Sequence, residues 1–384
     1  MSANLIPVKT YLGKFYSELS DTVLTSQKYQ HTNINSFFEQ RFFIQNNKVQ
    51  MIVDVTLKGL RIVVSGNEIY VSKELYKHPS IDITNSIEEK SKTSDPRSLY
   101  SSKTFSTIAY LICQNHTLFK VIGDIDEPIY ITFKSEYEAF YSSVLLFMVN
   151  AGVSVNIVEE IESHCAINSV VNYILNPYAA LNVSTFYKNQ RPALSFFFRN
   201  IIAQVASTYN HLLLGRGSSN VVDENRILLE SEAKANVRGK IDVSNSSFHS
   251  IVEVTSSGHD NFINIDYRNT AKDKGTVTFT PVVEVSGLTT INLNADSLVI
   301  DDDSSILVTP TVNTPMNSVF TKTNINNRVL DPEELRTLVT DDVDENEAID
   351  LIISDFSKEI SDRVGIHCQS GTERYYDIKN KFLG

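Results

Sequence analysis

The sequence has no tryptophan and only three cysteines, Cys113, Cys165 and Cys368, among 384 residues. Three cysteines do not make a disulfide framework, so we expect a reducing compartment such as the cytoplasm. The longest apolar run, Val144 to Val149, is far shorter than the roughly 20 residues that a membrane-spanning helix needs. The chain does not open on a basic segment followed by an apolar run, so we expect neither a membrane span nor a secretory signal.

Positive charge is scarce as well, since 34 Lys and Arg residues stand against 46 Asp and Glu residues, for a net charge of −12. A protein that binds nucleic acid through its phosphates needs a basic face, so we expect no nucleic-acid partner.

Motifs of common catalytic sites are missing too, including Gly-x-Ser-x-Gly and His-Glu-x-x-His. The Gly-rich stretch Leu214–Asn220 lacks the Gly-Lys-Ser/Thr ending of a phosphate loop. We interpret it as a turn and expect no enzyme.

A regular spacing of small residues dominates the middle of the chain. Gly152, Ala179, Ala206 and Ala233 follow one another at a constant step (179 − 152 = 27), and two further steps reach Asp260 and Gly287. Short β-rich runs follow these marks: Val153–Ile157, Ala180–Val183, Ser207–Tyr209, Val237–Ile241, Phe262–Ile265 and Ile291–Leu293. A fixed period of this length is typical of stacked repeats, in which each coil buries its apolar face against the next. The pattern predicts a mainly β fold, a parallel β-helix.

Two details of that fold follow from the spacing. Asn156, Asn182 and Asn210 recur near the same point of successive coils, so we expect their amides to stack and satisfy one another inside the turns. Strand residues two apart share a face, so Phe279, Val283 and Val285 are expected inside the winding.

The two ends of the chain have other patterns. Residues 1 to about 45 indicate amphipathic helices, 49–71 a hairpin around Ser65-Gly66-Asn67, 77–103 a surface loop or linker, and Phe105–Cys113 a further helix. After Pro315, Asp331 and Pro332 form a helix start. A second helix carries an apolar stripe at Ile349, Ile352, Ile353 and Phe356.

Three groups of polar residues have both a functional and a structural interpretation. The pairs His164-Cys165 and His367-Cys368 would form a metal site if the fold brought them together, but neighbours on a strand point to opposite faces. The acidic run that begins at Asp301 is either a metal-binding triad or, as we expect, a solvated turn. Glu159, Glu160 and Glu162 are expected to form a solvated acidic edge.

Five stretches in a fixed order carry a resemblance to a known family: Asp126–Ile131, Leu228–Gly239, Tyr267–Phe279, Asp296–Asp303 and Leu335–Ala348. They resemble the SufB/SufD family, the scaffold subunits of the SUF system for iron–sulfur cluster assembly. The first stretch is similar to the Glu-Pro-Ile segment that enters the family's β-helix. The last is similar to the helix–turn–helix that follows its final coils. The resemblance covers roughly residues 105–360 and is nearer to SufD.

The resemblance implies a right-handed parallel β-helix at 105–316, between an N-terminal α/β region at 1–104 and a small C-terminal helical domain at 317–384. It also implies two partners. A second SufB/SufD-like subunit would pair as a homo- or heterodimer through strands near Ile291–Val308. A SufC-like ABC ATPase would bind the C-terminal helices, where the candidate partner-binding residues are Leu335, Leu338, Ile349, Ile352, Ile353 and Phe356.

Departures from the family pattern concern the cluster ligands. The position of the SufB cysteine is Ala295 here, and the family's histidine position falls at about Ser318. Neither residue supplies the thiolate or imidazole that an iron–sulfur site requires. The resemblance therefore implies a scaffold subunit without a resident cofactor, which would hold a cluster only transiently or with a partner. The alternative is a structural β-helix protein, of viral or surface origin, that has left cluster assembly.

Overall fold

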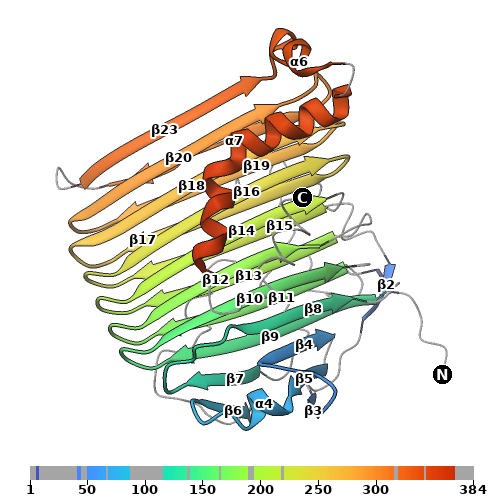
Figure 1. The fold of residues 1–384 in the computed structure, drawn as a ribbon. Coiled ribbons are helices and arrows are strands. Elements are labelled where there is room, and N and C mark those ends of the chain that lie inside the picture. Colours follow the sequence, from blue (N-terminus) through green and yellow to red (C-terminus); the bar gives the residue numbers. More distant parts are fainter. Residues whose placement is uncertain are drawn as a thin grey trace.

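The computed structural model describes residues 6–7, 41–44, 50–65, 68–86, 116–135, 139–163, 166–188, 194–217, 220–314, 319–340 and 343–367. These residues form two large sheets and a few helices. The sheets face each other along the length of the molecule, and successive strands alternate between them (Figure 1).

One sheet has twelve strands. Its main path runs through β1 (Ile6–Pro7), β2 (Arg41–Ile44), β9 (Ala139–Val149), β11 (Ala166–Leu175), β13 (Leu194–Ala203), β15 (Asn220–Leu229), β17 (Ser247–Ser256), β19 (Thr276–Val285) and β21 (Ser305–Val308). Three more strands join it at its ends: β6 (Ile81–Ser86), β7 (His116–Val121) and β22 (Thr311–Asn313).

The other sheet has eleven strands. In order they are β23 (Val319–Val329), β20 (Thr289–Val299), β18 (Asn261–Lys272), β16 (Lys234–Ser244), β14 (Thr208–Gly217), β12 (Ala180–Tyr187), β10 (Ser154–Ser163), β8 (Ile129–Ser135), β4 (Arg61–Ser65), β5 (Glu68–Ser72) and β3 (Gln50–Asp54). Between β23 and β8 all neighbouring strands are parallel. The predicted parallel β-helix is confirmed, and each of the six β-rich runs lies in one of its strands or at the strand's edge.

The step of 27 residues is an average. In the eleven-stranded sheet Ser154 pairs with Ala180 (180 − 154 = 26), and Ala180 pairs with Thr208 (208 − 180 = 28). The corners contain residues with positive φ: Gly152, Tyr178, Ala206, Glu232 and Asp260. The marks at Ala179 and Ala233 directly follow such residues and are fully buried. The equivalent positions after the other three corners hold Val153, Ser207 and Asn261, so this position does not require a small residue in every coil.

The space between the sheets is filled by inward-facing apolar side chains. Phe279 and Val283 are 0% exposed and Val285 is 5% exposed, which confirms their predicted position. Gly239 has a packing role, because a Cβ atom there would lie 2.2 Å from the ring of Tyr267. That ring stacks on Phe279 with centroids 4.0 Å apart.

The asparagine ladder exists, but on the strands and not inside the turns. Asn182 donates to Asn156, Asn210 to Asn182, and Asn236 to Asn210, each at 2.8 Å between Nδ2 and Oδ1. These side chains are half-buried and alternate along their strands with core residues, so the ladder runs along the outer face of the eleven-stranded sheet. It satisfies one amide per coil without using the core.

The N-terminal end is closed by short elements. The predicted hairpin is confirmed, since β4 and β5 are antiparallel. The prediction of a loop at 77–103 is wrong for its first part, because β6 pairs with β7. A short helix, α4 (Lys73–Tyr76), was not predicted and is capped by Ser72. The helices predicted within 1–45 fall mostly outside the described residues, as does Phe105–Cys113.

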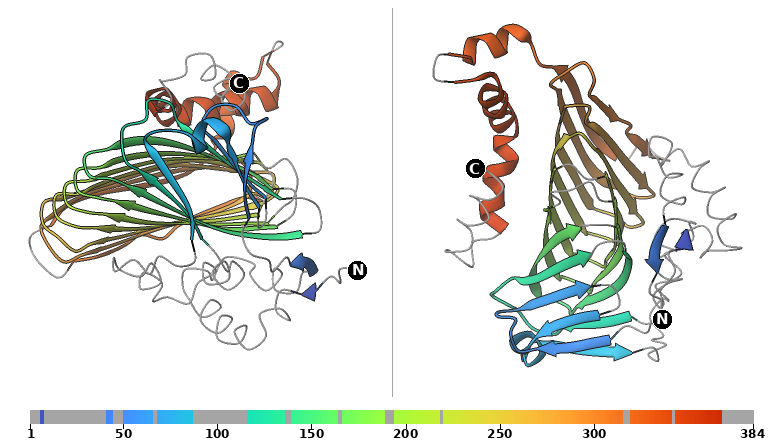
Figure 2. Two further views of the ribbon diagram at one scale, coloured as in Figure 1. Left: turned by 90° about the horizontal axis from the view of Figure 1, so that it is seen from below. Right: turned by 90° about the vertical axis from the view of Figure 1, so that its right-hand side faces the viewer.

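Two helices follow the last strand. The predicted start is confirmed: Asp331 caps α6 (Pro332–Leu338) and accepts a hydrogen bond from the Glu333 N–H at 2.9 Å. The longer α7 (Glu345–His367) lies along the outer face of the eleven-stranded sheet (Figures 1 and 2). The sheet itself continues past residue 316, because β23 pairs along its whole length with β20. Within the described part of the chain, no helix combines the length and the hydropathy that crossing a membrane requires.

Substitution of Val283 by Asp tests the core. The variant would bury an unpaired charge between Val254 and Val312 in the paired strands, so we expect a loss of about 3–5 kcal/mol in unfolding free energy. The control is Val282→Asp, which faces the other side of the same strand. Urea unfolding should separate the two variants, and equal midpoints would contradict the inward position of Val283.

Candidate functional site

Of the two positions that the family resemblance singled out, Ala295 lies among the described residues. Ala295 is 0% exposed and stacks in the core between Tyr267 and Ile325, so it presents only a methyl group. Ser318 lies outside the described residues, as do His164-Cys165 and Cys368. In the part of the chain that the structure describes, no group of three or more His, Cys, Asp or Glu side chains is arranged to hold a metal ion.

Two polar stretches from the sequence have structural roles. Asp301 accepts hydrogen bonds from the Asp273 N–H at 2.6 Å and from the Ser304 hydroxyl at 3.0 Å, which makes its run the expected turn. The interpretation of Leu214–Asn220 as a turn is wrong at both ends, because β14 continues to Gly217 and β15 starts at Asn220.

The candidate partner-binding residues are divided between covered and exposed positions. Ile352 is 5% exposed and packs with Leu298 and Leu330 of the β-helix. Leu335, Ile349 and Phe356 are partly buried against the same cluster. Ile353 is half-buried and Leu338 is 38% exposed. The apolar stripe of α7 thus packs mainly against the β-helix, and not in a separate core formed by the two C-terminal helices.

A second contact holds the far part of α7. Ile360 is 1% exposed and packs among outward side chains of three coils: Val158, Phe186, Leu212 and Leu214. Lys272 on β18 also forms an ion pair with Asp350, at 3.2 Å. The helix therefore crosses the outer face of the sheet from β20 to β10 and is fastened at both ends of that path.

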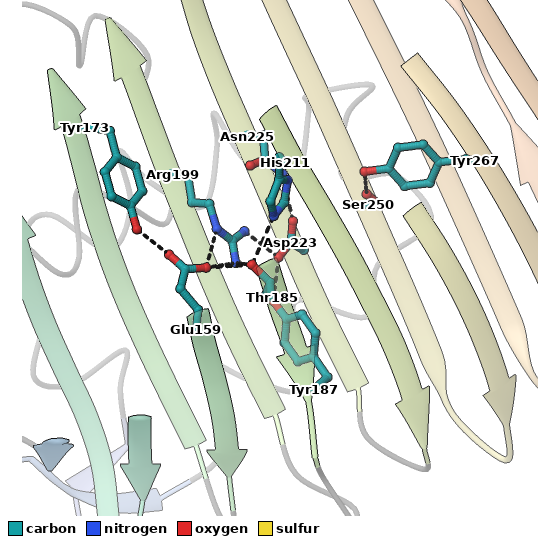
Figure 3. Close-up of polar contacts among 10 residues, drawn as sticks. All are labelled: Glu159, Tyr173, Thr185, Tyr187, Arg199, His211, Asp223, Asn225, Ser250 and Tyr267. Atoms are coloured by element: carbon teal, nitrogen blue, oxygen red, sulfur yellow. Dashed lines mark hydrogen bonds and ion pairs between the residues drawn. The ribbon is translucent and has the colours of Figure 1, made fainter. Parts of the chain in front are cut away.

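The most concentrated polar arrangement lies inside the β-helix. Arg199 on β13 is fully buried and binds two fully buried carboxylates, one from each sheet. Its Nε and Nη2 lie 2.7 Å from Glu159 Oε2, and its Nη1 lies 2.7 Å from Asp223 Oδ2. Figure 3 shows the guanidinium between the two acids. We call these three residues, with Tyr173, Thr185, Tyr187, His211 and Asn225, the interior polar cluster.

Neutral donors complete the coordination of both acids. The Tyr173 hydroxyl donates to Glu159 Oε1 at 2.7 Å, and the Thr185 hydroxyl donates to Glu159 Oε2 at 2.6 Å. For Asp223 the donors are the Tyr187 hydroxyl at 2.6 Å and the Asn225 amide at 2.9 Å (Figure 3). Every carboxylate oxygen thus accepts at least one hydrogen bond, as buried charge requires.

Strand register explains how distant residues meet. Glu159 on β10 pairs with Thr185 on β12, and His211 on β14 pairs with Val183, two residues before Thr185. All three are therefore inward-facing residues of the eleven-stranded sheet, in two neighbouring columns. Arg199 and Asp223 come from the facing sheet. The expected solvated edge is therefore wrong for Glu159, although Glu160 and Glu162 do face outward. The sequence does indicate this inward position, because Glu159 lies two residues from Ile157 and two from Ile161, and strand residues two apart share a face.

The electrostatics of the cluster follow from burial. Burial works against the charge of Arg199, but the carboxylates of Asp223 and Glu159 outweigh it and raise the guanidinium pKa. Burial is also the largest cause that raises the pKa of Tyr173, Tyr187, Tyr209 and Tyr267, so these phenols stay neutral. The face of Phe197 lies 4.4 Å from the guanidinium, which adds a cation–π contact.

The charged groups of this cluster are all buried and paired with one another. Both acids are engaged as acceptors and Arg199 as a donor, so none of the three is open to a substrate. Tyr209 is different, because its buried hydroxyl has no hydrogen-bond partner. We conclude that the interior polar cluster joins the two sheets in the middle of the β-helix.

Removal of the cation should destabilise the protein strongly. Arg199→Met leaves two buried carboxylates without a counter-charge, so we expect a loss of about 3–5 kcal/mol in unfolding free energy. Adding Glu159→Gln and Asp223→Asn to that variant should restore most of it. The control is Arg336→Met, whose ion pair on α6 is 74% exposed and should contribute under about 1 kcal/mol. Equal urea midpoints for Arg199→Met and Arg336→Met would contradict this account.

Comparison with known protein families identifies a match. The family described as SUF system FeS cluster assembly, SufBD core domain, matches residues 132–356, more than half of the 384-residue chain. The match starts within β8 and ends within α7, so it includes the coils, the interior polar cluster and the contact of α7 at Ile352, but not the one at Ile360. No curated protein matches the sequence.

Proposed function

Because the chain belongs to the SufBD core family of the SUF system for iron–sulfur cluster assembly, we propose that it is a scaffold subunit that acts by binding partners and not by catalysis. The family match over the β-helix and α7 is the observation that carries the proposal. The three cysteines of the sequence support a reducing location, the cytoplasm.

The subunit is proposed to be SufD-like and to bring no cluster ligand of its own. In support, the family resemblance assigns the position of the SufB cysteine to Ala295, which is enclosed by the core. A methyl group cannot bind iron, and thiolate is the usual cluster ligand. A cluster would then be held by a partner or only in passing.

The second β-helix subunit is proposed to bind at the C-terminal end of the stack. There β23 is the last strand of its sheet, and such an edge presents unpaired backbone groups to another chain. Phe320 is 71% exposed and Val329 is 63% exposed on this strand. The sequence led us to expect subunit pairing through Ile291–Val308. Because β20 already has a neighbouring strand on both sides, we propose instead that the partner subunit contacts β21, β22 and β23.

A SufC-like ABC ATPase is proposed to bind the side of α6 and α7 that faces away from the β-helix. Leu338, Val339 and Leu351 are 38%, 40% and 51% exposed there. Asp344 and Glu345 beside them are exposed as well, and their charge would favour a basic surface on the partner. The covered residues Ile352 and Ile360 would instead keep the helix in place.

Affinity purification of the protein with mass spectrometry tests the partners. We expect an ABC ATPase and a second β-helix subunit to co-purify. A charge on the edge, in the double variant Phe320→Lys and Val329→Lys, should release the β-helix subunit and keep the ATPase. Val55→Lys is the matched control, since Val55 is 73% exposed at the opposite end. Recovery of neither partner would contradict the proposed function.

Anaerobic reconstitution with iron and sulfide tests the cofactor. We expect the isolated protein to lack stoichiometric iron and the charge-transfer absorbance of a cluster. A cluster spectrum that disappears in Cys165→Ser or Cys368→Ser would show that this chain has ligands of its own, and would overturn the SufD-like assignment while leaving the scaffold role in place.

A further inference from the structure

The interior polar cluster has an unbalanced formal charge. Glu159 and Asp223 contribute two negative charges and Arg199 one positive charge, and all three side chains are 0% exposed. Isolated charge in a protein interior is costly, and proteins avoid it by pairing or by binding a proton. The cluster therefore needs one more positive charge or one more proton.

Hydrogen-bond counting gives the direction of one contact. The Thr185 hydroxyl has a single hydrogen, which it donates to Glu159 Oε2 at 2.6 Å. Its oxygen accepts from Arg199 Nη2 at 2.9 Å. The remaining contact, 3.0 Å to His211 Nε2, must then have the imidazole as donor. His211 thus carries a hydrogen on Nε2 and points it toward the acidic side of the cluster (Figure 3).

Few groups near His211 can take the missing proton. The titratable or charged side chains that face the interior around it are Glu159, Tyr173, Tyr187, Arg199, Tyr209, Asp223 and Tyr267. The phenols stay neutral, and Arg199 is already charged. The oxygens of both acids accept hydrogen bonds from hydroxyl, amide and guanidinium donors. Among the described residues of the cluster, His211 is the remaining basic group.

We propose that His211 is a proton-binding site: in the folded protein it is an imidazolium that balances the interior polar cluster at two positive and two negative charges. Nε2 donates to the Thr185 hydroxyl, which in turn donates to Glu159, so that the imidazolium lies one hydroxyl group away from the carboxylate. The ring of Tyr209 stacks on the imidazole at 6.1 Å between centroids and covers it on that side.

A proton taken up on folding makes stability depend on pH with a definite sign. A histidine in the unfolded chain loses its proton near pH ~6.5. Below that pH both states hold the proton, so the stabilisation is complete. Above it, folding must take up one proton, and the folding equilibrium constant falls about tenfold for each pH unit. The middle of the scaffold would therefore weaken as the pH rises.

Nitrogen NMR of the histidine side chains in the full-length protein at pH 8 tests the protonation directly. The His211 signals are identified by their loss in His211→Gln. Two nitrogens in the imidazolium range support the proposal. One protonated and one bare nitrogen overturn it and assign the proton to a carboxyl group.

Urea unfolding between pH 6.5 and 9 is the second measurement. The folding constant of the parent, divided by that of His211→Gln, should fall about tenfold per pH unit, because glutamine can donate to Thr185 but cannot bind the proton. His249→Gln is the matched control, since His249 is buried and contacts Thr280 outside the cluster. A parent-to-His211→Gln ratio that is constant with pH overturns the proposal. If His211→Gln does not fold, the His211 signals are assigned by selective labelling of the parent protein instead. The NMR measurement at pH 8 then decides whether His211 is protonated.

Discussion

Every part of this molecule depends on the parallel, in-register pairing of one coil with the next. A single coil would leave backbone groups unpaired along both strands and would expose its apolar side. Pairing solves both problems at once, since the same register that satisfies the backbone also places each inward side chain over its equivalent in the previous coil. From β10 to β18 the coil lengths alternate between 26 and 28 residues (180 − 154, 208 − 180, 234 − 208 and 262 − 234), and the strands keep their register because the turns absorb the difference.

Stacking has no natural end, so the two ends of the β-helix must be treated differently. At the N-terminal end the chain reverses direction, and the β4–β5 hairpin and the β6–β7 pair replace the parallel coils. At the C-terminal end β23 is added as one more parallel strand, and most of its side chains are exposed. This asymmetry leaves β23 as an exposed edge at one end, while α7 covers part of the outer face.

The interior polar cluster adds specificity that the apolar columns lack. Columns of Val, Ile and Leu are similar from one position to the next, so they distinguish poorly between alternative pairings. A shift of β10 by one residue would turn Glu159 to the outside and leave Arg199 with one carboxylate. Because breaking a buried ion pair is costly, the cluster favours one alignment of the two sheets. Its charge balance then makes the same region sensitive to protons.

Local patterns in the sequence were sufficient for the repeating architecture and for the elements built from neighbouring residues. The parallel β-helix, the strands after each mark, the hairpin, the inward position of Val283 and the cap at Asp331 all depend on contacts within a few residues or on a strict period. Tertiary structure decided what depends on register between distant strands. It brought Glu159, Arg199 and Asp223 together from three coils, put the asparagine ladder on the outer face, and laid α7 over the sheet. Parity alone indicates that Glu159 points inward. Only the facing sheet supplies the guanidinium that lets a carboxylate remain there.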